Sequence, residues 1–153
     1  MLNIFTVKTK EDIDITKELF VEYADSLGFD LFFQNFNEEL ENFPGEYIPP
    51  EGCLLLARYN DQPIGCVALR KLSYGICEMK RLYVKEEFRG LKIGKALAET
   101  IIHQARKMEY DYMRLDFIAP RIAEQLYKSL GFKEIAPYEN IPIKGAVFME
   151  LKL

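Results

Sequence analysis

The chain has 153 residues and a formal net charge of -4, with 49% hydrophobic, 29% charged and 13% aromatic residues and no tryptophan. Its length is typical of one domain, so we expect a single domain over residues 1–153. An apolar content this high excludes a disordered or collagen-like chain. The sequence has no basic-then-apolar signal segment and no window of roughly 20 apolar residues, so we expect a cytoplasmic protein without a membrane span.

The charge is unevenly distributed along the chain. Residues 1–50 carry eleven Asp or Glu and three Lys, a net charge of -8, which leaves +4 for residues 51–153. Two interpretations stay open: solvated helix faces, or two surfaces that meet different partners. The acidic balance disfavours nucleic-acid binding, because affinity for nucleic acid rests on a concentrated basic surface that neutralises phosphates.

Cysteine and histidine usage argues against a metal site. Cys53, Cys66 and Cys77 stand about a dozen residues apart in apolar stretches, so they form neither a CxxC pair nor an even disulfide set. We expect reduced thiols in the core. The one histidine, His103, follows Glu99 at helical spacing, which favours a surface pair over a zinc ligand or a catalytic base.

Hydrophobic periodicity, turn residues and glycines predict the elements in chain order. They are a strand at 2–7, a helix at 12–27, a short helix within 29–43, a loop at 45–52, strands at 53–59, 64–72 and 76–84, a helix at 91–108, a strand at 112–118, a helix at 121–130, and strands at 132–135 and 146–153. We expect a mixed sheet with helices on its faces, an α/β or α+β architecture.

The strand at 76–84 and its neighbours lead to two more specific expectations. The strands on either side of the 91–108 helix should be parallel and joined by a right-handed crossover. Strict alternation in the 76–84 strand predicts two faces. One face would carry Glu78, Lys80, Leu82 and Val84, and the other Met79, Arg81 and Tyr83.

The segment at 87–96, EFRGLKIGKA, lies where that strand gives way to a helix. Gly90 and Gly94 allow a tight turn and a close approach to a ligand, while Arg89, Lys92 and Lys95 add positive charge beside the unpaired N–H groups of a helix start. Such a segment suits a phosphate or pyrophosphate. It matches neither common phosphate-loop pattern, and an ordinary helix start with exposed cations is the alternative.

The residues Arg89 to Gly94, RGLKIG, resemble the pyrophosphate-binding motif [QR]-x-x-G-x-[GA] of the GNAT acetyltransferase superfamily, with Lys92 in place of the middle glycine. The resemblance extends to ICEMKRLYV before the motif and to LYKSLGF at 126–132, and it covers roughly residues 53–150. It implies a mixed, mostly antiparallel sheet of about six or seven strands flanked by about four helices.

The resemblance implies that acetyl-CoA is the co-substrate. Its pyrophosphate would lie on the amides of residues 91–96, and its pantetheine arm would pair with the strand at 82–84, where an N–H near Leu82 or Tyr83 polarises the thioester carbonyl. The residues it assigns to the cofactor are Leu82, Tyr83, Val84, Arg89, Gly90, Leu91, Lys92, Ile93, Gly94, Lys95, Ala96 and Tyr127.

The implied reaction is direct attack of an amine on the thioester in a ternary complex, which needs a base for the ammonium and an acid for the leaving thiolate. Tyr127, in LYKSLGF, matches the position of the acid, and a core aromatic is the alternative. Glu78 is the candidate base, acting through water, and a cross-strand ion pair is its alternative. Asp116 and Phe117 would flank the cofactor at a strand end.

The acceptor would enter between residues 29–43 and 138–145 and would be a primary amine of a small molecule or peptide. Four phenylalanines in the first of these segments are either core or pocket wall, namely Phe29, Phe32, Phe33 and Phe36. The acidic first third favours a cationic amine. A non-catalytic acyl-CoA-binding or regulatory module, a phosphotransferase and a hydroxyl acceptor stay open, as does the choice between monomer and homodimer.

Overall fold

A single mixed sheet runs through the computed structural model, which describes residues 1–27, 35–118 and 122–153. Its strands are β1 (Leu2–Thr6), β2 (Cys53–Tyr59), β3 (Gln62–Ser73), β4 (Ile76–Val84), β5 (Tyr112–Phe117), β6 (Lys133–Ile135) and β7 (Val147–Lys152). Their order is β1-β2-β3-β4-β5-β7-β6. Only the pairing of β4 with β5 is parallel within these residues, which confirms the predicted mixed and mostly antiparallel sheet.

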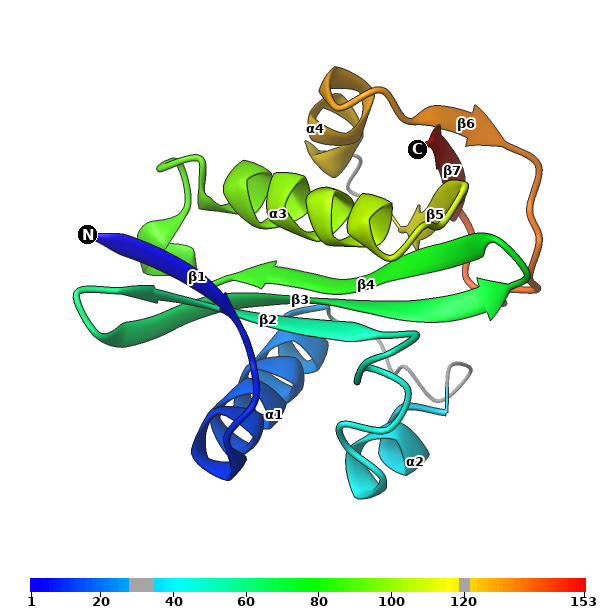
Figure 1. Ribbon diagram of the computed structural model, residues 1–153. Coiled ribbons are helices and arrows are strands. Elements are labelled where there is room, and N and C mark those ends of the chain that lie inside the picture. Colours follow the sequence, from blue (N-terminus) through cyan, green and yellow to red (C-terminus); the bar gives the residue numbers. More distant parts are fainter. Residues whose placement is uncertain (28–34, 119–121) are drawn as a thin grey trace.

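Helices cover both faces of the sheet (Figure 1). On one face lie α3 (Ile93–Lys107) and α4 (Ile122–Ser129), and on the other lie α1 (Lys10–Ser26) and α2 (Phe36–Glu41). A short 3-10 turn, η2 (Glu86–Phe88), leads from β4 towards α3. The described residues contain no helix long and apolar enough to cross a membrane. Part of the predicted 29–43 helix lies outside the described residues, as do Phe29, Phe32 and Phe33.

The sheet is buried on both faces, so the sequence of β2 is a continuous apolar run rather than an alternation of apolar and polar residues. Leu55 packs with Leu97 and Ile101 in the core under α3, while Leu56 packs with Phe20 in the core under α1. Phe36, the one described member of the predicted aromatic cluster, belongs to the α1 core. It is a core residue and lines neither of the two cavities described below.

The three cysteines are buried and free, as predicted. Burial raises the pKa of the Cys77 thiol to about 12, so it stays protonated at neutral pH and is a poor nucleophile. Cys53 and Cys66 also have a raised pKa because they are buried. These thiols fill the core and do not supply a reactive thiolate.

Strand β4 contains a bulge at Arg81. Cys66 of β3 lies opposite Tyr83, whereas Ala68 lies opposite Lys80, so β4 has one more residue than β3 between these pairs. Arg81 has a φ of +61°, in the left-handed region that non-glycine residues rarely adopt. An extra residue of this kind shifts the side-chain alternation of every residue that follows.

The bulge corrects one expectation. Leu82 and Val84 pack against the core under α3, while Tyr83 packs against the core under α1. Strict alternation, which placed Leu82 and Val84 on the face of Glu78 and Lys80, is wrong because the extra residue reverses the pattern after Lys80. Beyond the bulge, the side chains of β4 therefore face opposite to the simple prediction.

Strands β4 and β5 run together over a short distance only. Their parallel pairing extends from Ile76, opposite Tyr112, to Glu78, opposite Arg114. Beyond Glu78 the two strands have no paired residues in the described chain, although both continue to run through the sheet. The divergence leaves the β5-facing edge of β4 open to another hydrogen-bonding partner.

Candidate active site

A cavity of about 780 Å³ lies where β4 and β5 diverge. One wall is the second half of β4, the opposite wall is the end of β5, and the loop from η2 to α3 closes one end. Side chains of α1 and α4 complete the lining. The cavity thus combines a free strand edge with the start of a helix.

The start of α3 is shaped to receive an anion. Lys92, the N-cap residue, has a φ of +62°, and its side chain does not cap the helix. The first N–H groups of a helix have no partner within the helix, so those of the first turn of α3 are available to a ligand. Arg89 donates from Nε to the carbonyl oxygen of Val84 at 3.0 Å, which anchors the loop to the end of β4.

Most residues predicted to bind the cofactor line this cavity. They are Leu82, Tyr83, Val84, Arg89, Gly90, Lys92, Ile93, Gly94, Lys95 and Tyr127. Leu91, 58% exposed, and Ala96 are outside the lining. The Ala96 N–H donates to the Lys92 carbonyl within the helix at 3.1 Å, so it is not open to a ligand. His103 lies on the exposed side of α3 and lines neither this cavity nor the second one described below.

Tyr127 is both a core aromatic and a cavity residue. Its ring lies 5.5 Å from that of Phe117 and 5.7 Å from that of Phe132, centroid to centroid. Burial raises the pKa of the Tyr127 hydroxyl, and the neighbouring Tyr23 and Asp116 raise it further. The hydroxyl is therefore protonated at neutral pH and can act as a hydrogen-bond donor.

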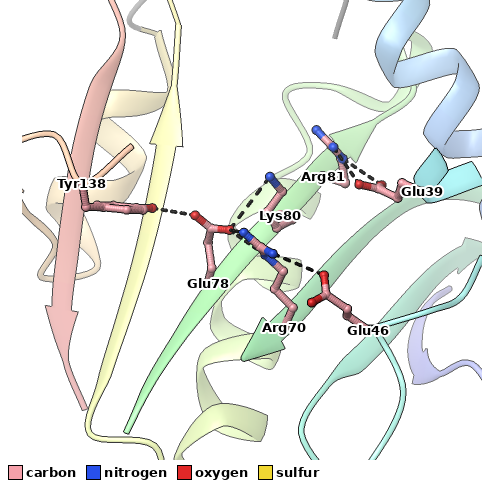
Figure 2. Close-up of polar contacts among 7 residues, drawn as sticks. All are labelled: Glu39, Glu46, Arg70, Glu78, Lys80, Arg81 and Tyr138. Atoms are coloured by element: carbon pink, nitrogen blue, oxygen red, sulfur yellow. Dashed lines mark hydrogen bonds and ion pairs between the residues drawn. The ribbon is translucent and has the colours of Figure 1, made fainter. Parts of the chain in front are cut away.

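Glu78 lies at the centre of a polar cluster on the side of the sheet that α2 covers (Figure 2). It is fully buried. Its Oε1 accepts from Nε of Arg70, the cross-strand neighbour on β3, at 2.8 Å, and Tyr138 Oη–H donates to Oε2 at 2.7 Å. Lys80 Nζ lies 3.9 Å from Oε1. The cross-strand ion pair is thus present, and both carboxylate oxygens are engaged.

A second cavity, of about 430 Å³, lies beside this cluster on the side of α2. Four carboxylates and two cations contribute to a largely polar wall. Its lining residues are Asn35, Glu38, Glu39, Asn42, Pro44, Gly45, Glu46, Tyr47, Arg70, Lys80 and Glu139. We call it the acceptor cavity, because it lies where the sequence places the acceptor. Its net charge is negative.

The bulge residue Arg81 ties the acceptor cavity to β4. Its guanidinium donates to both carboxylate oxygens of Glu39 on α2, at 3.1 and 2.9 Å, and lies 5.2 Å from the ring centroid of Phe36. Arg81 is 5% exposed. A bidentate pair this well buried fixes the direction of the α2 wall relative to the bulged strand.

Asp116 is a carboxylate that sequence reasoning assigned only to the cofactor's flank. It lines the larger cavity, and its carboxylate lies within 4.8 Å of those of Glu78 and Glu139. Burial raises the pKa of Asp116 to about 6, opposed by Lys80 and increased by Glu78 and Glu139. The signal in the sequence was its place at a strand end, but the charged residues that shift its pKa come from two other segments, β4 and the loop before β7.

Comparison with known proteins follows this geometry. Residues 50–134 match the family model described as acetyltransferase (GNAT) domain. The chain is 43% identical over 155 residues to an uncharacterized N-acetyltransferase of Schizosaccharomyces pombe, across 99% of this chain and 95% of that protein. It is 30% identical over 99 residues to N-acetylaspartate synthetase of Homo sapiens, across 63% of this chain and 33% of that protein.

Solved structures share the fold at lower identity. A GNAT-family acetyltransferase from Staphylococcus aureus Mu50 superposes with a TM-score of 0.78 at 24% identity, over 99% of each chain. An acetyltransferase of Bacillus subtilis in complex with CoA superposes with a TM-score of 0.69 at 22% identity, over 100% of this chain and 99% of that one. The seven-stranded sheet and its flanking helices therefore form a GNAT fold.

Proposed function

The chain belongs to the GNAT family of N-acetyltransferases, and on this premise we propose that it transfers the acetyl group of acetyl-CoA to a primary amine of a small molecule or peptide. The amine would attack the thioester directly, with both substrates bound together. The observation that carries this proposal is the meeting of two cavities at β4, one suited to an anionic cofactor and the other polar and acidic.

The larger cavity suits acetyl-CoA by its donors and its charge. The N–H groups at the start of α3, with the cations of Arg89, Lys92 and Lys95, would hold the pyrophosphate. The free edge of β4 at 82–84 would pair with the pantetheine arm as an added strand does. The CoA complex of the Bacillus subtilis protein, which has this fold, supports the assignment. An N–H near Leu82 or Tyr83 would stabilise the oxyanion that forms during attack.

Two carboxylates compete for the role of base. An alkyl ammonium has a pKa of about 10, so it must lose a proton before it attacks. Glu78, the candidate from the sequence, would have to release Arg70 or Tyr138 to accept that proton. Asp116 lines the cavity between β4 and β5 and has a pKa of about 6, near neutrality. We therefore propose that Asp116 is the base that accepts the proton. Glu78 then holds its cationic neighbours in place.

The leaving group is the CoA thiolate, whose developing charge needs a donor. Tyr127 lines the cavity with a hydroxyl that stays protonated, because burial raises its pKa. We assign Tyr127 a hydrogen bond to the leaving sulfur. Since its pKa lies above that of a thiol, stabilisation of the thiolate by this bond matters more than complete proton transfer.

The acceptor cavity favours a cationic amine. Glu38, Glu39, Glu46 and Glu139 outnumber the cations in its wall, and α2, which carries two of them, belongs to the acidic first third of the sequence. A negative field of this kind concentrates cations and is weakened by salt. We expect this reaction in the cytoplasm.

Acetyl-CoA turnover over a panel of amines tests the proposal. Free amino acids, polyamines, aminoglycosides and peptide N-termini would each be mixed with the purified chain and acetyl-CoA, and the released CoA thiol measured. We expect release with at least one amine, faster for cations than for anions of similar size, and more so at low salt. Tight acetyl-CoA binding without release would point to a binding module. Thermal protection by ATP but not by acetyl-CoA would refute the cofactor assignment.

A further inference from the structure

Lys80 lies where the two cavities meet. Among the described residues it is the one that lines both the cavity between β4 and β5 and the acceptor cavity. Its side chain is 9% exposed. In Figure 2 it extends from β4 with its ammonium turned towards Glu78, whereas Arg81 is turned towards Glu39. An amine that reaches the thioester from the acceptor cavity therefore passes beside the amine of Lys80.

The surroundings of Lys80 favour its neutral form more than water does. Burial lowers the pKa of Lys80, and the positive charges of Arg81 and Arg70 lower it further. The carboxylates of Glu78 and Asp116 act in the opposite direction without cancelling this effect. Because the neutral amine is the nucleophile, a larger fraction of Lys80 is reactive at a given pH than for a lysine in water.

The position of Lys80 along β4 brings its backbone close to the expected reaction centre. It lies two residues before Leu82, near which an N–H is expected to polarise the thioester carbonyl, and two residues after Glu78, where pairing with β5 ends. The proton acceptor assigned above, Asp116, lines the same cavity and carries the charge that acts on Lys80. A nucleophile, a proton acceptor and the cofactor edge are thus together in one place.

We propose that Lys80 is itself acetylated when no amine occupies the acceptor cavity, an inference that rests on the acetyl transfer proposed above. The lone pair of neutral Nζ forms the bond to the acetyl carbon, and the C–S bond breaks to release CoA as its thiolate. The proton lost by the nitrogen passes to the Asp116 carboxylate and from there to the thiolate. The products are Nε-acetyl-Lys80 and CoA, and no further reactant is needed.

Acetylation of Lys80 would lower the activity of the enzyme. The modified side chain is uncharged and bulkier, so it removes a cation beside Glu78 and Asp116 and narrows the junction of the cavities. Asp116 would lose the neighbour that lowers its pKa. Turnover of an added amine would fall in proportion to the acetylated fraction, and a bound amine would protect Lys80.

Mass spectrometry of the purified full chain tests this inference. The chain is incubated with acetyl-CoA and no amine, its intact mass is followed over time, and the site is mapped on peptides. We expect one acetyl group per chain, located on Lys80, at a rate that saturates with acetyl-CoA and does not depend on protein concentration. Lys80→Arg should remove this mark. Lys71→Arg, a matched change at an exposed lysine of β3 paired with Glu51, should keep it.

Chemical acetylation would give a different pattern and would overturn the inference. Exposed lysines such as Lys71 and Lys133 would then be labelled before Lys80, or unfolded chain would be labelled at Lys80 as fast as folded chain. If the chain turns over an added amine but leaves Lys80 unmodified in the incubation without amine, the inference is overturned and acetyl transfer still stands. Absence of acetyl-CoA binding, of turnover and of labelling overturns both.

Discussion

Replacement of Asp116 by Asn should stabilise the protein and reduce its activity. Burial, with Glu78 and Glu139, raises the pKa of Asp116 from its ordinary 3.8 to about 6. The folded state therefore binds this proton more tightly than the unfolded state does. Below a pH of about 4 the carboxyl is protonated in both states and costs little. As the pH rises to about 6, the unfolded state ionises first, and the wild-type protein loses stability relative to an amide at this position.

The size of the effect follows from the pKa difference. A shift of about two units corresponds to about 3 kcal/mol once the pH exceeds the folded pKa. For a chain of 153 residues, each kcal/mol moves the midpoint of thermal unfolding by roughly 2 to 4 °C, so Asp116→Asn should raise it by roughly 6 to 12 °C at pH 8. Loss of the base should lower kcat/KM by roughly 10²-fold or more.

Urea unfolding of wild type and variant, followed by circular dichroism at pH 4.5, 6 and 8, measures the free-energy difference. We expect the gap to grow with pH. Asp25→Asn, at an exposed position of α1, is the matched control and should change stability by less than about 0.5 kcal/mol. The kcat/KM of the wild type should decrease as the pH drops below about 6, and the variant should not show this decrease. A gap of zero at pH 8, or one that shrinks as the pH rises, would refute the reasoning.

Three further substitutions separate the roles of the remaining site residues. Glu78→Gln should lower the free energy of unfolding by about 2 to 3 kcal/mol, because it removes a buried charge from its partners, and urea unfolding would detect this; full stability with lost activity would favour Glu78 as the base. Tyr127→Phe should lower kcat by roughly 10²-fold, measured by stopped-flow, and leave the acetyl-CoA dissociation constant, measured by calorimetry, unchanged. An unchanged kcat would mean that this tyrosine serves only in packing. Arg89→Ala should raise the KM for acetyl-CoA roughly tenfold, whereas Lys133→Ala, at an exposed position of β6, should leave it unchanged.

The sheet, its helices and the loop at 89–94 could be predicted because their signals are local. Apolar periodicity and turn residues mark each element, and the Gly90–Gly94 segment carries its chemistry within a few neighbouring residues. The bulge at Arg81 could not be read in this way. It depends on how β3 aligns with β4, so strict alternation placed Leu82 and Val84 on the wrong face.

The acceptor side was less predictable because its parts are far apart in the sequence. Arg70 comes from β3, Lys80 from β4, Asp116 from β5 and Glu139 from the segment before β7. Arg70, Asp116 and Glu139 lie outside the quoted motifs, and Lys80 lies within ICEMKRLYV without a role that the sequence assigns to it. Folding brings them together, and their burial then sets the pKa of Asp116 and of Lys80. In the sequence these are four unrelated charged residues, whereas in the structure they form one group whose charges act on one another.

The geometry of β4 is held from both sides. A Cβ on Gly65 of β3 would lie 2.6 Å from the carbonyl oxygen of Tyr83, so only glycine lets the two strands approach so closely beyond the bulge. On the other side, the ion pair of Arg81 with Glu39 holds the bulge residue against α2. The edge that would pair with the cofactor and the wall that would receive the acceptor therefore share one rigid strand.

Charged residues on a central strand carry a cost that the fold alone does not explain. Glu78 is fully buried and the Lys80 side chain nearly so. Removing two such charges from water costs several kcal/mol, and apolar residues of similar volume are often as stable or more so. The cost is confined to the part of β4 between the end of its pairing with β5 and the bulge. It falls where an ammonium would have to lose its proton, so chemistry at the junction of the cavities accounts for it better than stability does.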